Sequence, residues 1–149
     1  MNMDNVGIWD KIIKGAAIAG GAVAGIFGEW SVLLSVLACV MTLDYISGML
    51  VAATGNSLKT EGGGLDSKVG FMGLAKKCFI MIMVLLATLL DRVIGTDGMV
   101  FQTAVTCYYI ANEGISIMEN AGLMGLPVPA IVKRALEQMR EKAEEDNVK

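Results

Sequence analysis

The chain has 149 residues, of which 54% are hydrophobic and 18% are charged, whereas soluble domains average about 45–50% apolar and about 25% charged residues. This composition indicates a membrane domain. The sequence contains no histidine, which excludes a catalytic triad and a histidine-ligated zinc site. We therefore predict no catalytic, cofactor-binding or metal-binding residues. A net charge of −3 also argues against nucleic acid as a partner.

Four apolar stretches predict an all-α, multi-pass membrane protein with four transmembrane helices. They cover about residues 11–28, 31–53, 74–94 and 99–118. A helix that crosses a bilayer needs roughly 20 apolar residues, so the second and fourth stretches are long enough. The third is long enough if Lys76 and Lys77 snorkel to the lipid headgroups.

The first stretch is the shortest, with an uncharged run of only about 14 residues. Trp9 and Trp30 flank it, however, and are 21 positions apart, which corresponds to about 31 Å at 1.5 Å per residue. This length matches the hydrocarbon core, and tryptophan favours both membrane interfaces. We predict a transmembrane helix here. An interfacial or re-entrant segment and a cleaved signal peptide are the alternatives.

The distribution of positive charge predicts the orientation of the chain. With four spans, 11 of the 12 Lys and Arg residues fall on one side of the membrane and only Arg92 falls on the other. By the positive-inside rule, both termini then lie in the cytoplasm. The three cysteines, Cys39, Cys78 and Cys107, lie within apolar runs and are predicted to be small buried hydrophobes.

The loops and the tail divide the chain into a transmembrane domain, residues 1–122, and a cytoplasmic amphipathic tail, residues 123–149. Residues 54–73 contain three consecutive glycines and are predicted to form a flexible linker. Pro127 and Pro129 end the helical pattern of the fourth span. Beyond them, apolar residues recur at helical spacing from residue 130 to residue 145, which predicts one further helix.

Polar residues at membrane depth are the candidate functional residues. Two of them lie on one face of the second span, and the others form a stripe along the fourth: Asp44, Ser47, Gln102, Thr106, Tyr109, Asn112, Glu113, Ser116 and Asn120. Such a stripe cannot face lipid, because unpaired polar groups in hydrocarbon cost several kcal/mol each. Hydrogen bonds inside a closed helix bundle, the lining of a pore and an ion-coupled site are the three interpretations.

Small residues in the first two spans are candidates for close helix packing. Two stripes occupy the first span and one residue continues the polar face of the second: Ala17, Gly21 and Gly25; Gly20, Ala24 and Gly28; and Gly48. Small side chains allow the backbones of neighbouring helices to approach each other. We expect these residues to form contacts within or between protomers.

Five short motifs, in order along the chain, resemble the toxin-secretion and phage-lysis holin family. They are Leu43-Asp44-Tyr45-Ile46-Ser47-Gly48; Ser67-Lys68-Val69-Gly70-Phe71 with Gly73 and Lys76-Lys77; Leu90-Asp91-Arg92; Tyr109-Ile110-Ala111-Asn112-Glu113 with Ser116, Glu119-Asn120 and Gly122; and Gly125-Leu126-Pro127-Val128-Pro129. The resemblance covers about residues 12–140. The glycine-rich segment 61–65 departs from it, because the loop of this family is usually shorter.

The resemblance implies a protein of the bacterial inner membrane that forms homo-oligomers and catalyses no reaction. Such proteins open lesions that release an endolysin, or a toxin without a signal of its own. The bilayer, an endolysin or toxin, and an antiholin are the expected partners. Two alternatives remain open at this point: an antiholin of the same family, and a subunit of an ion-coupled transporter that uses Asp44 and Glu113.

Overall fold

The structure is a computed structural model that describes residues 10–15, 17, 18, 20, 21, 25 and 31–146. The chain divides into two units, residues 1–30 and residues 31–149. The described residues of the first unit are helical, and Lys14 forms an ion pair with Asp10 at 2.8 Å. Trp9 and Trp30, on which the prediction of a first span depends, lie outside the described residues.

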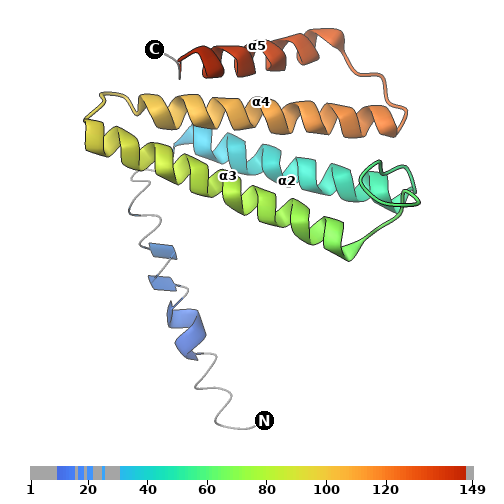
Figure 1. Ribbon diagram of the computed structural model, residues 1–149, viewed down its shortest axis with the longest axis horizontal. Coiled ribbons are helices and arrows are strands. Elements are labelled where there is room, and N and C mark those ends of the chain that lie inside the picture. Colours follow the sequence, from blue (N-terminus) through green and yellow to red (C-terminus); the bar gives the residue numbers. More distant parts are fainter. Residues whose placement is uncertain (1–9, 16, 19, 22–24, 26–30, 147–149) are drawn as a thin grey trace. The chain divides into compact units, whose positions relative to one another are not determined.

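The second unit consists of four helices, with no strand among its described residues (Figure 1). They are α2 (Val32–Ala53), α3 (Ser67–Ile94), α4 (Val100–Leu123) and α5 (Ala130–Asp146). The predicted all-helical class is therefore confirmed for this part of the chain. Figure 1 shows α4 in the middle, with α2 and α3 on one side and α5 on the other.

Capping residues set the helix boundaries. At the start of α2, the hydroxyl of Ser31 accepts a hydrogen bond from the backbone of Leu34 at 3.2 Å. At the start of α3, the carboxylate of Asp66 accepts a hydrogen bond from the backbone of Val69 at 2.8 Å. Because of this second cap, α3 begins at Ser67 and takes in residues that were predicted to belong to a linker. Gly95, in the left-handed conformation with φ 72°, ends α3.

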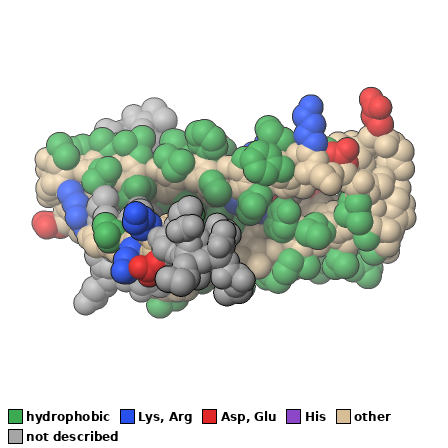
Figure 2. All heavy atoms as spheres, turned by 90° about the horizontal axis from the view of Figure 1, so that it is seen from below, with side chains coloured by type: hydrophobic (Ala, Val, Ile, Leu, Met, Phe, Trp, Pro, Cys, Tyr) green, Lys and Arg blue, Asp and Glu red, His purple; other side chains and the backbone are tan. Residues whose placement is uncertain are grey.

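Only α2 and α3, of the described helices, are both long enough and apolar enough to cross a membrane, with mean hydropathies of 1.9 and 2.0. Their outer surfaces are apolar as well: hydrophobic side chains are spread along the face shown in Figure 2. The side chains of Cys39 and Cys78 are exposed, and Cys107 is half-buried. The predicted burial of the first two is thus wrong, because an apolar run on these helices faces outward as well as inward.

Candidate functional site

A cluster of three charged side chains joins α2, α3 and α4. The Lys77 ammonium on α3 donates a hydrogen bond to Asp44 Oδ2 on α2 at 2.7 Å and another to Glu113 Oε2 on α4. The three side chains are only 11%, 13% and 10% exposed. Two carboxylates therefore share one ammonium in the interior, and this charged cluster fixes the three helices at one level.

An amide and a hydroxyl extend the charged cluster toward the end of α2. Asn120 Nδ2 on α4 donates to Ser47 Oγ at 2.8 Å and lies 3.3 Å from Asp44 Oδ1. Gly48 lies beside this amide, since a Cβ added there would sit 3.7 Å from Asn120 Nδ2. The predicted polar and small face of α2 thus meets the polar side of α4.

A second polar cluster lies at the other end of α4. The buried carboxylate of Asp91, near the end of α3, accepts hydrogen bonds from the backbone of Phe101 at 3.0 Å and of Gln102 at 2.8 Å, and one from the hydroxyl of Thr96. The side chain of Gln102 in turn donates to Thr88 Oγ1 at 2.8 Å. An acid on α3 therefore caps the first turn of α4.

The structure brings most of the predicted stripe on α4 into the interior. Four of its residues are buried, namely Gln102, Thr106, Glu113 and Asn120. Tyr109 and Ser116 are half-buried, and Asn112 is exposed. Every buried side-chain nitrogen or oxygen in the described part of the chain has a hydrogen-bond partner. In this arrangement Gln102, Glu113 and Asn120 form hydrogen bonds to other helices. Thr106 donates to the backbone oxygen of Gln102 within α4 at 2.6 Å.

Sequence analysis missed Lys77, which was expected to snorkel. Lys76 is exposed, but Lys77 is only 9% exposed and points inward. A helical wheel contains the missing signal, because Lys77, Thr88 and Asp91 lie on the same face of α3 within about 60° at 100° per residue. This polar face packs against the polar faces of α2 and α4. A lysine on it is a suitable partner for the two predicted acids, Asp44 and Glu113.

The small residues of the first stretch lie at the surface in the described part of its unit. Ala17, Gly20, Gly21 and Gly25 are exposed within the described residues, whereas Ala24 and Gly28 lie outside them. A role for these residues in helix packing remains a prediction. Among the described residues, no group of three or more Cys, Asp or Glu side chains is arranged to hold a metal ion.

Comparisons with known proteins identify a family and several relatives. Residues 21–141 match the model of the bacteriophage holin family. An uncharacterized protein of Halalkalibacterium halodurans is 42% identical over 81% of this chain and 87% of its own length. An uncharacterized protein of Listeria monocytogenes is 41% identical over 94% of this chain and 95% of its own.

A probable holin of Bacillus phage phi105 is 29% identical over 73% of this chain and 74% of its own length. No solved structure matches the chain.

Proposed function

Because the chain belongs to the bacteriophage holin family, we propose that it is a holin that self-associates in the bacterial inner membrane and opens large, non-selective lesions. Family membership and the two apolar helices α2 and α3 identify it as a membrane protein. An endolysin, or a toxin without its own signal, would leave the cell through the lesions. The similarity to a probable phage holin supports this proposal.

One observation supports the mechanism. Polar side chains form a hydrogen-bonded network between the helices, and the outer faces of these helices are apolar. Asp44, Lys77 and Glu113 are buried between helices in the single chain, which suits a chain surrounded by lipid. In a large assembly the same polar faces would line a water-filled opening. Self-association then shifts the population from the closed to the open arrangement, because water solvates these groups and lipid does not.

In the proposed topology, four helices span the membrane and both termini are cytoplasmic. Residues 1–122 form the membrane domain and residues 123–149 form the tail. The excess of Lys and Arg on one side supports this orientation. The charged face of α5, with exposed Lys133, Arg134 and Glu141, supports a tail in water.

Controlled expression in a bacterium tests the proposed function. With an endolysin present, we expect growth to stop abruptly, the membrane potential to collapse and the endolysin to reach the cell wall. Expression without the endolysin should still collapse the potential. The matched control is the same vector with a stop codon early in α2.

Two other results would contradict a holin. Ion flux that depends on a gradient, without loss of viability, would indicate a transporter subunit that uses Asp44 and Glu113. Delay of lysis caused by a separate holin, with no effect of the chain alone, would indicate an antiholin. Both outcomes are read from the same cultures, with a fluorescent dye for membrane potential and counts of surviving cells.

A further inference from the structure

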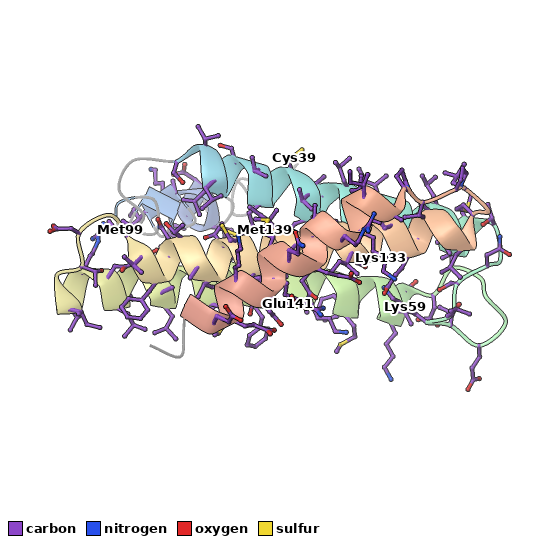
Figure 3. All side chains as sticks on the ribbon, turned by 90° about the horizontal axis from the view of Figure 1, so that it is seen from above. Cys39, Lys59, Met99, Lys133, Met139 and Glu141 are labelled. Atoms are coloured by element: carbon purple, nitrogen blue, oxygen red, sulfur yellow. The ribbon has the colours of Figure 1, made fainter. Side chains whose placement is uncertain are left out.

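The amphipathic helix α5 covers one side of α4 in the structure (Figure 3). The two helices approach closely at Gly114, where an added Cβ would lie 3.0 Å from Leu136 Cδ1. Toward the start of α4, an open pocket lies between the two helices and is lined by residues of both, among them Val100 and Cys107 on α4 and Met139 on α5. The two helices are antiparallel neighbours, as Figure 1 shows.

The surface of α4 under α5, here called the α5-binding face, is made of small and apolar residues. It comprises Val100, Thr103, Ala104, Cys107 and Gly114. Thr103, Cys107 and Gly114 lie within about 20° of one line along the helix at 100° per residue. The face is shaped to seat a helix closely, and it lies on a different side of α4 from the polar residues Gln102, Glu113 and Asn120 that contact α2 and α3.

The exposed surface of α5 is too charged to enter hydrocarbon. Its exposed residues include six charged side chains, Lys133, Arg134, Glu141, Lys142, Glu144 and Glu145. Lys142 lines the same pocket as Gly98 and Val100, so α5 reaches back along α4 to its first turn. If α4 crosses the bilayer, as in the proposed function, a docked α5 would carry these charges to membrane depth, which is strongly unfavourable. Docked α5 and lipid-embedded α4 therefore exclude each other.

We propose that the α5-binding face of α4 has two alternative occupants: α5 of the same chain, as in the structure, and α4 of a second copy in the membrane assembly. This inference rests on the proposed function. When α5 moves into water, the face that seats a helix in the structure, Gly114 included, is left vacant. A second α4 fits it because small residues let two backbones approach each other, whereas lipid chains leave such a surface poorly filled.

Cys107 provides a native reporter, because its side chain lies within the α5-binding face. We start from a chain with Cys39→Ala and Cys78→Ala, which removes the two exposed thiols. Membranes from producing cells are oxidised, and disulfide-linked dimers are measured on non-reducing gels. We expect dimers through Cys107. Gly114→Leu should lower the dimer fraction roughly tenfold, which is the effect of about 1.4 kcal/mol of overpacking.

Gly122→Leu is the matched control, since nothing lies within 4 Å of a Cβ added at Gly122 on the same helix. It should leave the dimer fraction unchanged. Membrane levels of all variants are measured by immunoblot. Equal dimer fractions in the Gly114→Leu and Gly122→Leu variants would overturn the inference.

A locked α5 gives a second, independent result. Met139→Cys is added to the background that retains Cys107, and a short, reducible crosslinker joins the two thiols within one chain. We expect the joined protein to leave the membrane potential intact and reduction to restore its collapse. The unjoined variant is the control.

Several outcomes would overturn the inference and leave the proposed function standing. These are a joined protein that still collapses the potential, failure of the two thiols to be joined, and collapse of the potential without Cys107 dimers. If even the parent chain leaves the potential intact, the proposed function fails instead.

Discussion

At the scale of single residues, the charged cluster is asymmetric, because one cation serves two acids. Lys77 is hydrogen-bonded to both Asp44 and Glu113, so its removal would leave two carboxylates facing each other in the interior. Removal of one acid would still leave a complete pair. Since breaking a buried ion pair by removing one partner costs about 3–5 kcal/mol, the three positions differ in how much the folded state depends on them.

We therefore expect Lys77→Met to destabilise the protein by about 3–5 kcal/mol and Glu113→Gln to cost clearly less. In the Glu113→Gln variant, Lys77 keeps Asp44 at 2.7 Å and the glutamine side chain still accepts a hydrogen bond. Denaturation of the purified protein in detergent, followed by circular dichroism, measures the difference. Lys76→Met is the control, since Lys76 is exposed on the same helix turn. Equal losses for Lys77→Met and Glu113→Gln would contradict the asymmetry.

The acids themselves are expected to affect the timing of lysis. Asp44→Asn keeps the shape of the side chain and removes its charge, so the balance between the buried and the water-facing arrangement should change while the protein still inserts into the membrane. Optical density of induced cultures gives the lysis time, and immunoblots of membranes give the protein level. If both Asp44→Asn and Glu113→Gln left the lysis time unchanged, hydrogen bonding between helices would be their only remaining role.

At the scale of helices, periodicity predicted most of the boundaries. The second span was expected at 31–53 and α2 is Val32–Ala53; the tail helix was expected at 130–145 and α5 is Ala130–Asp146. The fourth span was expected at 99–118, and α4 continues to Leu123, with Asn120 still on its inner face. The helix α3 begins earlier than predicted, because the side chain of Asp66 caps its first turn directly after the glycines.

The connection between α3 and α4 depends on one buried acid. Asp91 accepts hydrogen bonds from the backbone of Phe101 and Gln102, which have no partner one turn earlier in α4. Asp91→Ala should lower the unfolding free energy by about 1–3 kcal/mol, because it leaves buried donors unsatisfied, and detergent denaturation measures this loss. Asp97→Ala, an exposed acid in the neighbouring turn, should change stability little. A similar loss in both variants would argue against a capping role.

The first stretch gives a prediction from its small residues alone. If the stripe that contains Gly21 is a helix interface, Gly21→Leu adds bulk where two backbones approach and costs about 1–3 kcal/mol of association. We expect normal membrane levels, fewer crosslinked oligomers and delayed or lost lysis. Ala22→Leu, about 100° around the helix, is the control. Similar behaviour of the two variants would favour an interfacial or lipid-facing anchor.

At the scale of the whole molecule, pattern predicted which faces are polar but not which helices meet. Asp44, Ser47 and Glu113 were identified from their spacing, and the structure brings them together. Spacing carries no information on distance between helices, so Lys77 as their common partner and the contact of Leu136 with Gly114 were not predicted. Four spans were predicted. Of the described helices, only α2 and α3 are both long enough and apolar enough to cross a membrane. The fourth predicted span, α4, is less apolar because of its polar residues.

The orientation in the membrane follows from charge and is open to direct measurement. A variant without Cys39, Cys78 and Cys107 receives single cysteines by Met3→Cys, Asp97→Cys or Asn147→Cys, and intact cells are treated with a membrane-impermeant maleimide before lysis begins. With four spans and the excess of Lys and Arg on the cytoplasmic side, only the Asp97→Cys variant should be labelled. Disrupted cells, in which all three variants react, are the control. External labelling of Met3→Cys together with protection of Asn147→Cys would remove one span and contradict the four-span topology.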